Sequence, residues 1–556
     1  MHTPELIERL TGVLAPNGYT PRSKSEQKYP KRALIDGAIV TRSAPSPTGF
    51  MHIGTIYMSL INKLVAQHSS GVNMLRIEDT DKKREIENGV STIVSALNYF
   101  DLLPDEGVNE TGHSYGLYGP YMQSERADMY LGYAIDLLES GRAYPCFASS
   151  EELDANYKKQ QIEKVRPGYY GTWAVWRNKT EADIIEALDK GQQFVLRFRS
   201  NGSHEKRMTI KDILKGDLEL PENDSDVPLI KSDEYRLPTY HLAHVVDDHL
   251  MQTTMILRGD EWLPSTPLHI ELCQALDIKP FRYAHFAPIN IMDGMSKRKL
   301  SKRKDPQADI NYFIAAGYPT TAVLEYLIRL ANSSFEDWRK ENPDITLWEF
   351  PFSFKKWSKA RGALLDMQKL DDVSKDYIAT LPQGAYVTAL LEWSETFALY
   401  FMDAASQDMD YTHKVFAVER DGDNKRKDLA KWSDAPEQYG YFFDVLFGEH
   451  FAVRIADELK DFNVSIVTDA CTNFMATYNV HDDQDTWFTK LKAAAEKTGF
   501  ATDNKAFKAA PQNYKGNVAD FARILRVKLT SKNRTPDLWT IMKVMGVDRV
   551  RDRLQS

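Results

Sequence analysis

Cysteine is scarce in this chain of 556 residues: Cys146, Cys273 and Cys471 are the only three, and they lie far apart. A disulfide framework or a cysteine-based metal cluster needs thiols that are paired or closely spaced. The sequence therefore supports neither kind of site.

Long uncharged apolar runs are also missing, and the stretch from Met1 to Leu10 lacks the apolar core of a signal peptide. No G-x-x-x-x-G-K-[ST] motif occurs, which excludes the P-loop way of binding nucleotide phosphates. There is no internal repeat and no low-complexity tract. We therefore expect a cytoplasmic protein with no membrane partner.

Net positive charge is missing as well, because the formal net charge is −9. Taken alone, this argues against a nucleic-acid partner, since phosphate contacts need lysine and arginine. The segment Ser296 to Lys304, however, carries six positive charges and no negative one. Most charge runs are solvated loops, but the place of this segment beside a predicted nucleotide site favours phosphate binding.

What the chain does contain is ordinary for a large globular protein: 42% hydrophobic and 27% charged residues. Its length predicts roughly three to five domains. Alternating strands and helices from Gly37 to about Gly119 predict a parallel α/β sheet. Helical patterns dominate after the basic segment.

Individual elements can be predicted from hydrophobic spacing and from turn residues. We expect strands that end near Val40 and at Glu78. The sequence also predicts a helix at Pro4 to Leu14, a helix at Glu125 to Ser140, a strand at Phe194 to Arg199, sheet-like segments at Thr239 to Val246 and Thr254 to Leu257, and helices at Pro267 to Leu276, Ala322 to Leu330, Val387 to Phe401 and Val518 to Leu529.

The stretch from Arg42 to Thr55 (RSAPSPTGFMHIGT) joins a strand end, a rigid turn and a helix start. Its two prolines are incompatible with a continuous helix or with the hydrogen bonds of a central β-strand, and Gly49 permits a sharp reversal of the chain direction. The apolar spacing downstream places His52 and Gly54 at a helix N-terminus. Free backbone N–H groups and the positive end of the helix dipole meet there, so this junction is suited to bind phosphate.

This stretch resembles the "HIGH" signature of class I aminoacyl-tRNA synthetases. Together with Leu75 to Asp81 (LRIEDTD), it resembles the glutamyl-tRNA synthetases of bacterial type in particular. Further blocks follow in the family's order at Tyr121 to Arg126, Leu237 to His249, Arg258 to Trp262 and Lys299 to Arg303. A single short motif would be weak evidence, but so many ordered blocks are not a coincidence.

The resemblance implies a multidomain α/β plus all-α fold: a class I Rossmann-like catalytic domain, an inserted α+β acceptor-binding domain, a stem-contact domain and a helical C-terminal anticodon-binding domain. The expected ranges are an N-terminal extension at 1–36, the catalytic domain at 37–119 and 237–298, the inserted domain at 120–236, the "KMSKS"-like loop and stem-contact domain at 299–385, and the anticodon-binding domain at 386–556. The stem-contact segment itself runs from Gly362 to Leu370.

The implied activity is that of a glutamate–tRNA ligase, which forms glutamyl-adenylate from L-glutamate and ATP and transfers glutamate to the terminal adenosine of tRNA. The implied partners are L-glutamate, ATP with its Mg²⁺, and the glutamate tRNA, and we expect a monomer. Some bacterial members hold zinc in the inserted domain through closely spaced cysteines. Only Cys146 is present in the corresponding stretch, so we expect no zinc.

By resemblance, His52 and Lys302 are the catalytic residues, acting on the triphosphate of ATP as charge accumulates. Taken alone, His52 could be a helix-capping histidine. Lys297 is an alternative to Lys302 for the lysine of the "KMSKS" loop, because both follow a serine as that pattern requires. We favour Lys302, because only its serine is preceded two positions earlier by a lysine, Lys299. The ATP-binding residues are then His52, Gly54, Thr55, Lys299, Ser301, Lys302 and Arg303.

Glutamate needs cations for two carboxylates and an acceptor for its ammonium group. Arg42 and Glu78 are two candidates for these contacts, and the alternative is that they form a structural ion pair with each other. Glu261 is expected to contact the terminal adenosine of tRNA and ATP, whereas Trp262 is more typical of a core. By resemblance, the glutamate-binding residues are Arg42, Ser46, Glu78, Tyr240, His244 and Arg258, and His244 departs from the small polar residue usual in the family.

Three alternatives for function stay open at this stage. The enzyme could also charge the glutamine tRNA, because the anticodon contacts cannot be placed from the sequence. A short homologue that glutamylates a modified base lacks an anticodon-binding domain, and the long helical C-terminus argues against it. A non-catalytic tRNA-binding paralogue would not need His52, Lys302, Arg42 and Arg258 in their motif positions.

Overall fold

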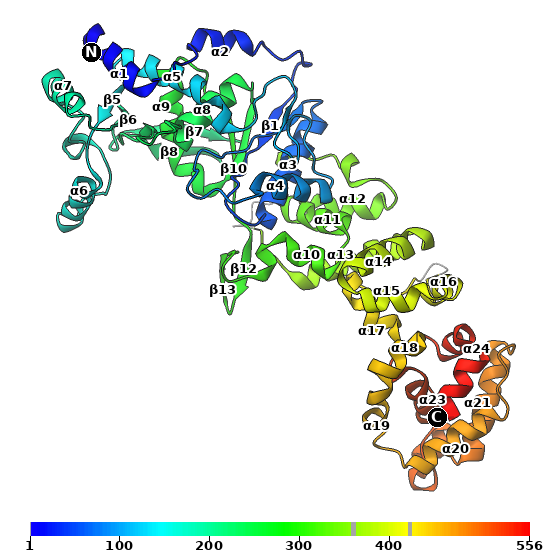
Figure 1. The fold of residues 1–556 in the computed structure, drawn as a ribbon. Helices are drawn as coiled ribbons and strands as arrows, with labels where there is room; N and C mark the ends of the chain where they lie inside the picture. The colour runs from blue at the N-terminus through cyan, green and yellow to red at the C-terminus, as the bar shows by residue number, and fades with distance from the viewer. Residues whose placement is uncertain (1, 357–362, 421–424, 556) are drawn as a thin grey trace. The chain divides into compact units, whose positions relative to one another are not determined.

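The computed structural model describes residues 2–356, 363–420 and 425–555. The chain divides into two compact units, which are described separately (Figure 1). Unit 1 comprises Met1–Tyr312 and Leu324–Asp366, and unit 2 comprises Phe313–Val323 and Met367–Ser556.

A parallel sheet forms the centre of unit 1. Strand β1 (Val40–Ser43) pairs with β2 (Val72–Leu75), and β10 (Met255–Gly259) pairs with β11 (Arg282–Phe286), both in parallel. Hydrogen bonds between Val40 and Thr254 connect the two strand pairs. The nucleotide fold is therefore assembled from two segments of chain about 200 residues apart in sequence, as its discontinuous motifs predict.

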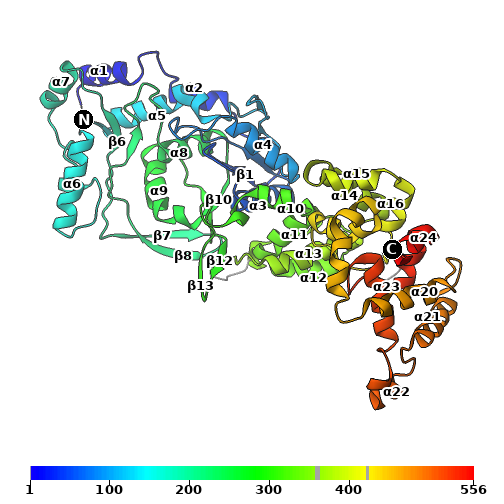
Figure 2. The same cartoon turned by 60° about the horizontal axis from the view of Figure 1, so that its bottom comes forward.

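Helices cover both sides of this sheet. Figures 1 and 2 show α3 on one side of β10, and α8 and α9 on the other side. The side chains of α3 that face the strands are apolar and fully buried, including Ile56, Leu60, Ile61 and Leu64. The helices here are α3 (Ile53–His68), α4 (Gly89–Tyr99), α8 (Tyr240–Leu250) and α9 (Thr266–Ala275).

Helix α8 corrects a sequence-based prediction, since Thr239 to Val246 was expected to be sheet-like. Every residue from Leu242 to Asp248 is buried, so the helix has no polar face that would reveal a helical period. The strand predicted to end at Val40 instead begins there. The helix at Pro4–Leu14 and the junction at His52 are as predicted.

The N-terminal extension packs on unit 1 instead of standing apart. The apolar face of α1 (Pro4–Leu14) is buried, and the guanidinium of Arg32 forms two 2.8 Å bonds with Glu106. The polar stretch after α1, for which no element was predicted, forms α2 (Arg22–Lys28).

The segment expected to be an inserted domain contains two kinds of structure. One part is its own antiparallel sheet, in the order β5 (Ala143–Cys146), β6 (Val195–Phe198) and β9 (Pro228–Ile230), with α5 (Ala127–Glu139), α6 (Ser150–Ile162) and α7 (Glu181–Asp189). The other part is the hairpin of β7 (Arg207–Asp212) and β8 (Gly216–Pro221), which extends the catalytic sheet because β7 pairs with β11. The hairpin therefore belongs to the same sheet as β10 and β11, and the inserted-domain range stays a prediction.

The basic segment is only partly a loop. Its first half forms β13 (Ser296–Lys299), which pairs with β12 (Asn290–Asp293) in an antiparallel hairpin. Figures 1 and 2 show this hairpin projecting from unit 1. The remaining elements of this part of the chain are β3 (Gly107–Val108), β4 (Ser114–Tyr115), α10 (Ile310–Ala316), which begins in unit 1, α11 (Thr320–Ala331), which begins in unit 2, and α12 (Ser334–Glu341).

Among its described residues, unit 2 consists of helices, turns and one isolated β-bridge between Ala501 and Asn517, and a large apolar core joins most of the helices. The helix predicted at Val387 to Phe401 is broken at Ala398 into α14 and α15. The first residue of the stem-contact segment, Gly362, lies outside the described residues. The helices are α13 (Met367–Thr380), α14 (Gln383–Phe397), α15 (Leu399–Ser406), α16 (Met409–Phe416), α17 (Ala435–Tyr439), α18 (Asp444–Leu446), α19 (Ile455–Glu458), α20 (Val464–Met475), α21 (Gln484–Thr498), α22 (Asn504–Ala509), α23 (Val518–Thr530) and α24 (Leu538–Gln555).

Candidate active site

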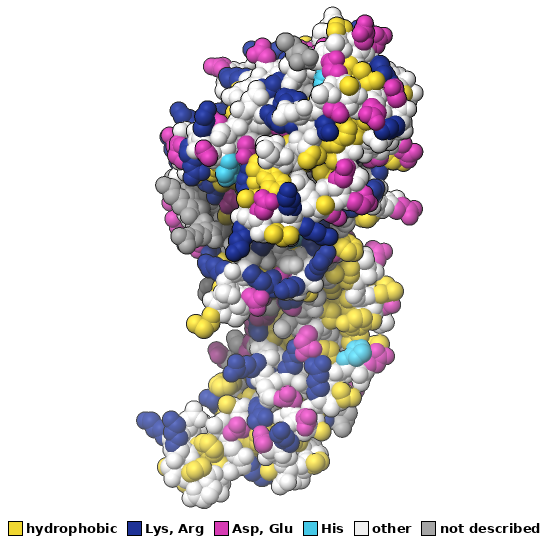
Figure 3. Space-filling model, turned by 90° about the vertical axis from the view of Figure 1, so that its left-hand side faces the viewer, with side chains coloured by type: hydrophobic (Ala, Val, Ile, Leu, Met, Phe, Trp, Pro, Cys, Tyr) yellow, Lys and Arg dark blue, Asp and Glu magenta, His cyan; other side chains and the backbone are white. Residues whose placement is uncertain are grey.

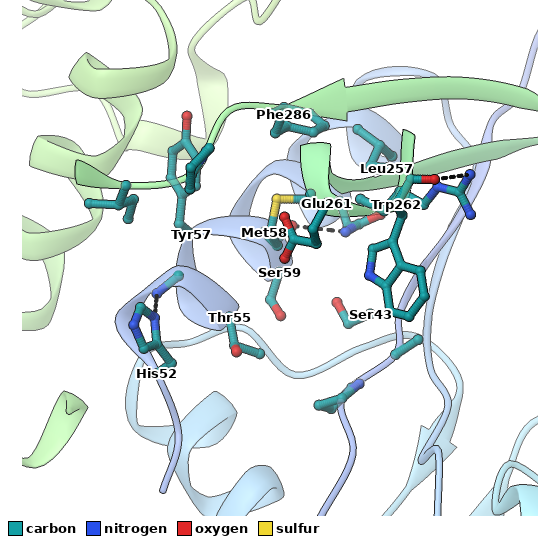
Figure 4. A pocket seen from close by; sticks show the side chains of 18 of the residues that line it. Ser43, His52, Thr55, Tyr57, Met58, Ser59, Leu257, Glu261, Trp262 and Phe286 are labelled. Carbon is teal, nitrogen blue, oxygen red and sulfur yellow. Dashed lines mark hydrogen bonds between the residues drawn. The ribbon is translucent and has the colours of Figure 1, made fainter. Parts of the chain in front are cut away.

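A cavity of about 450 Å³ opens where β1 and β10 end. Ligands in open α/β sheets bind at this carboxyl edge. Figure 4 shows His52 and Thr55 on one side of the cavity and Trp262 on the other, with Glu261 between them. Ten of the predicted site residues line it: Arg42, Ser46, His52, Gly54, Thr55, Glu78, Tyr240, Arg258, Glu261 and Lys299.

His52 caps helix α3. Its Nδ1 accepts a hydrogen bond of 2.8 Å from the backbone N–H of Gly54. A Cβ on Gly54 would lie 2.9 Å from that nitrogen, so glycine is needed to admit the ring. Burial and the nearby cations Lys302 and Lys299 lower the pKa of His52 to about 4, although the backbone of Leu300 raises it through a hydrogen bond. The ring is therefore neutral at pH 7 and donates from Nε2.

The capping alternative is thus correct as local structure, and it is compatible with catalysis. The cap occupies only Nδ1, and the other ring nitrogen, which makes the hydrogen bond to the backbone of Leu300, can donate to a ligand at the edge of the cavity by exchanging that bond. This nitrogen lies at the positive end of α3, where anionic groups are stabilised.

Lys302 approaches the same corner. Its Nζ donates a 2.5 Å hydrogen bond to the carbonyl of Phe50, two residues before His52. Lys297, the competing lysine, lies exposed in β13 opposite Met292. The geometry therefore favours Lys302 over Lys297 as the mobile cation of the site.

The loop that carries Lys302 is braced from within. Arg298 donates to both carboxylate oxygens of Asp305 at 2.6 and 2.7 Å, and Asp305 also accepts the backbone N–H of Ser301 at 2.8 Å. The hydrogen bonds from Arg298, together with the bond from Ser301 and the positive charge of Arg298, lower the pKa of Asp305 to about 2, although burial acts in the opposite direction. The cavity lining reaches Leu300 in this loop. Among the described residues that line the cavity, the next three predicted ATP-binding residues are absent: Ser301, Lys302 and Arg303.

Arg42 enters the cavity from the end of β1 and is held from behind by Asp248, at 3.1 Å from its Nε. Asp248 also accepts a 2.8 Å bond from Arg76, and neighbouring Asp247 pairs with Arg126 at 2.7 Å. The guanidiniums and carboxylates here are nearly all buried, so each charge needs its partner. Their attraction keeps the pKa of Asp248 well below its ordinary value, despite the opposing effect of burial.

Glu78 lies just beyond the end of β2, with its Oε1 3.2 Å from Arg76. The alternative ion pair with Arg42 is not formed between these described side chains, because Arg42 pairs with Asp248 instead. Burial raises the pKa of Glu78, while Arg76 and Arg42 lower it less strongly. A cation arriving in the cavity would find a carboxylate whose charge is only partly compensated.

Arg258 reaches the cavity from β10 and has a different set of partners. Its Nε donates to His285 at 3.0 Å, and its terminal nitrogens lie 3.1 Å from His269 and 2.8 Å from Thr266. None of these three partners carries a carboxylate. Longer contacts of 3.5 Å to the Tyr240 hydroxyl and 3.3 Å to the Trp262 carbonyl face the cavity.

His244 is placed behind the cavity wall instead of in it. It lies one helical turn after Tyr240 on α8, and the ring of Tyr240 stacks over it at a centroid distance of 5.4 Å. Its Nδ1 is 2.7 Å from Asp248. His244 is completely buried and does not line the cavity, so a direct contact with substrate, as predicted, does not fit this structure.

Several residues that shape the site were not identified from the sequence. Trp262, set aside as a core residue, lines the cavity and packs on Tyr240 at 4.1 Å. Asp248 and Asp212 support Arg42 and Arg258 from behind. Asp248 is an acidic residue in the largely buried helix α8, a pattern that could have revealed it, whereas Asp212 ends a strand whose residues alternate between exposed and buried and gives no such signal.

The stretch around Cys146, for which we expect no zinc, carries aromatic packing. The Sγ of Cys146 lies 3.2 Å from the hydroxyl of Tyr169 within a small apolar cluster. Within the described ranges, no three His, Cys, Asp or Glu side chains gather as a metal site would require. The absence of zinc stays a prediction.

In the part of the chain that the structure describes, no helix combines the length and apolar character needed to cross a bilayer. The face drawn in Figure 3 carries Lys and Arg side chains interspersed with Asp and Glu, so the negative net charge does not make this face uniformly acidic.

Comparison with known proteins assigns the chain to a family. Residues 38–370 match the model for the catalytic domain of class I tRNA synthetases (E and Q). A glutamate–tRNA ligase of Clostridium perfringens is 43% identical over 550 residues, covering 98% of this chain and 100% of that protein. One of Clostridium beijerinckii is 40% identical over 555 residues, covering 99% of each.

A solved structure gives the same picture of the fold. The chain superposes on a glutamate tRNA ligase of Elizabethkingia meningosepticum, solved in complex with its amino acid, with a TM-score of 0.73. The two are 24% identical, and the match covers 93% of this chain and 98% of the other.

Proposed function

Because this chain belongs to the glutamate–tRNA ligases of the class I aminoacyl-tRNA synthetases, we propose that the cavity at the ends of β1 and β10 is where it activates L-glutamate with ATP. The observation that carries this assignment is the lining itself. Two arginines, a carboxylate and a helix N-terminus with its histidine all converge on one cavity.

The glutamate end of the cavity is the part formed by Arg42, Arg258 and Glu78. Arg42 and Arg258 are almost fully buried, at 4% and 5% exposure, and guanidinium groups bind carboxylates through paired hydrogen bonds. Glu78 would accept the ammonium group. Tyr240 and Ser46 complete this end with hydroxyl groups.

The ATP end is the part formed by α3 and the basic loop. The N-terminus of α3, with Gly54 and Thr55, would hold phosphate oxygens, and the neutral His52 would donate from Nε2. Lys302 and Lys299 supply positive charge as pyrophosphate leaves. The Nζ of Lys299 lies 3.5 Å from Oε1 of Glu261. ATP or the terminal adenosine would separate this ion pair and contact the two side chains in its place.

The reaction needs little covalent help from the protein. One carboxylate oxygen of glutamate attacks the α-phosphorus of ATP, the bond to the β-phosphate bridge breaks, and pyrophosphate leaves. The terminal ribose hydroxyl of tRNA then takes the glutamyl group and releases AMP. Mg²⁺ would arrive with ATP and neutralise phosphate charge during the first step.

The remaining features follow from this function. The helical unit 2 would bind the anticodon part of the glutamate tRNA, the β5–β6–β9 region would approach the acceptor arm, and the enzyme would work as a monomer in the cytoplasm. Charging of the glutamine tRNA is a second outcome that depends on the anticodon contacts.

The test is aminoacylation by the full chain with purified transcripts of the glutamate and glutamine tRNAs, with ATP and either glutamate or glutamine. We expect glutamyl transfer that requires ATP and tRNA, and no glutaminyl transfer. Product on the glutamate transcript alone would mark a discriminating enzyme, and product on both a non-discriminating one. No product on either transcript would refute the proposed function.

A further inference from the structure

Four of the chain's 13 histidines surround Arg258, which is an unusual concentration around one cation. His285 and His269 accept its hydrogen bonds directly, His241 lies behind His269, and His244 lies 4.5 Å from His269 between ring centroids. The reaction proposed above uses none of these four rings. Their arrangement therefore calls for a separate explanation.

The partners of Arg258 differ between the back and the front of its guanidinium. At the back, His285, His269 and Thr266 are at most 1% exposed and lie 2.8 to 3.1 Å away. At the front, the contacts to Tyr240 and Trp262 are 3.3 to 3.5 Å long, and both of these residues line the cavity. The short bonds fix the group from behind, and the long ones can be exchanged for a ligand.

The tautomer of His285 is set by Asp212. Strand pairing places His285 directly beside Arg258, in register on β10 and β11. Its Nδ1 lies 2.7 Å from Asp212, which also accepts the backbone N–H of His285 at 3.1 Å. Because the carboxylate accepts a hydrogen bond from Nδ1–H, the ring proton stays on Nδ1 and Nε2 carries a lone pair, which is the only neutral form that can accept from Arg258.

A second chain of rings repeats this arrangement on the other side. Arg258 can only donate, so Nδ1 of His269 must accept, and its Nε2 then donates to Nδ1 of His241, 3.0 Å away. Burial, aided by the charge of Arg258, lowers the pKa of His241 to about 4 and that of His269 well below its ordinary value. Both rings therefore stay neutral and accept without repelling the guanidinium.

The contrast with Arg42 shows what this arrangement achieves. Arg42 is bonded directly to the carboxylate of Asp248, which compensates its charge at close range. The nearest carboxylate to Arg258 along its bonds is Asp212, one imidazole ring further away. Arg258 is thus held by short hydrogen bonds to neutral groups, so its charge is compensated less closely than that of Arg42.

We propose that Asp212, His285, His269 and His241 are positioning residues that hold Arg258 through two imidazole rings, so that it binds a carboxylate of glutamate with its charge uncompensated. This inference rests on the proposed function of the cavity. It also gives the β7–β8 hairpin a role in amino-acid recognition, because that hairpin supplies Asp212.

The test compares His285→Leu, which removes the acceptor, with His285→Gln, whose side-chain oxygen can still accept from Arg258. Aminoacylation of the glutamate tRNA transcript by the full chain is measured while glutamate and ATP are varied separately. We expect His285→Leu to raise KM for glutamate on the order of 10–100-fold, as when a supporting hydrogen-bond partner is removed, with KM for ATP unchanged. His285→Gln should recover most of the loss.

The pair His269→Leu and His269→Gln repeats the comparison on the other ring. His249→Leu is the matched control, because His249 lies on α8 as His241 does but bonds to Glu26, away from the cavity. It should leave both KM values unchanged. Equal losses in the Leu and Gln variants, or parallel rises in KM for glutamate and ATP, would overturn the proposal and indicate a structural role.

A spectroscopic measurement on the unmodified chain covers the case in which a Leu variant does not fold. In ¹⁵N-histidine-labelled protein at neutral pH, His285 should show a protonated Nδ1 and an unprotonated Nε2, with its signals assigned by their loss in His285→Gln. The opposite tautomer, or a doubly protonated ring, would overturn the proposal. A wild-type chain that makes no glutamyl-tRNA would instead refute the proposed function and leave this spectrum unaffected.

Discussion

Burial and neighbouring cations act in opposite directions on Glu78, and burial has the larger effect, so its pKa is raised above its ordinary value of 4.5. The carboxyl must be ionised to accept the ammonium group of glutamate. As pH falls through this raised pKa, the ionised fraction falls, and glutamate binding should weaken with it.

We therefore predict that KM for glutamate rises as the pH is lowered towards and through the raised pKa of Glu78. His52 and His241 do not interfere, because the pKa of each is lowered to about 4. Steady-state aminoacylation at several pH values measures the effect. Glu78→Gln should bind glutamate poorly at every pH, and a slope that persists in this variant would show that another group titrates.

His52 has two roles that one pair of variants can separate. His52→Ala removes both the cap of α3 and the Nε2 donor, so it should lower the free energy of unfolding by about 0.5–2 kcal/mol as well as the rate of adenylate formation. His52→Asn keeps a good capping side chain without the ring. It should retain the stability of the wild type and still lose activity.

Thermal unfolding and tRNA-dependent ATP–pyrophosphate exchange measure the two effects. If His52→Asn restored activity together with stability, capping alone would explain the histidine. That result would shift the catalytic burden to Lys302 and to the backbone N–H groups of α3.

At the scale of single residues, the sequence predicted where a side chain lies in a helix or strand better than it predicted which side chains bond to it. His52 could be placed at a helix N-terminus because apolar spacing and a preceding turn are local signals. The support of Arg42 by Asp248 and of Arg258 by His285 could not be predicted in this way. Asp248 lies 206 residues from Arg42 in sequence, so only the tertiary fold brings the two together.

At the scale of elements, the hairpin β12–β13 places the two candidate lysines in different local structures. Lys297 lies within the ladder of β13, whereas Lys302 lies in the braced loop that follows and reaches Phe50. We predict that Lys302→Ala lowers the activation rate by about 10²–10³-fold, as when a donor to developing charge is lost, and that Lys297→Ala changes it much less.

Single-turnover adenylate formation in the presence of tRNA measures both variants. Binding of tRNA should be nearly unchanged in Lys302→Ala, because the contact strengthens mainly in the transition state. A larger loss at Lys297, or equal losses at both lysines, would reverse the register.

Gly317 forms the turn directly after helix α10, and this turn belongs to unit 2. Gly317 has a φ of +77°, and a Cβ there would lie 2.7 Å from the Cβ of Trp432 and 2.8 Å from Nε1 of Trp393. Gly317→Ala should therefore destabilise unit 2 by about 1–3 kcal/mol, through backbone strain and overpacking. ATP binding should not change, because the cavity lies in unit 1.

Gly384→Ala is the matched control in the same unit, because nothing lies within 4 Å of its added Cβ and the residue is helical. This variant should keep or slightly raise the melting temperature. Calorimetric unfolding of both variants gives the comparison, and an unchanged melting temperature in Gly317→Ala would contradict the packing described here.

The elements that the sequence did not predict correctly share a physical cause. Helix α8 is buried on all sides, so its apolar run carries no helical period. The β7–β8 hairpin was assigned to an inserted domain because it lies between segments of that domain in sequence. Its pairing with β11 depends on strand contacts between residues about 70 positions apart, as in Tyr283 with Asp212, and no local pattern records them.

At the scale of the whole molecule, the boundary between catalytic and helical parts differs from the one expected near residue 385. Unit 2 begins at Met367 and also takes Phe313–Val323 from upstream. Helix α13, expected in the stem-contact domain, buries Leu370, Val373 and Ile378 and falls within unit 2. The hydrogen bond from Tyr318 to Asp371 lies within that unit as well.

This boundary predicts how two C-terminal truncations differ. A fragment that ends at Asp366 should unfold cooperatively and bind ATP, because the sheet and the cavity belong to unit 1. A fragment that ends at residue 385 keeps α13 without the rest of its unit, so it should bind ATP equally well but expose more apolar surface. Calorimetry, ATP titration and fluorescence of an apolar dye distinguish the two. Absence of a cooperative transition in the shorter fragment would mean that the units share a core, and equal dye binding by both would place α13 with unit 1.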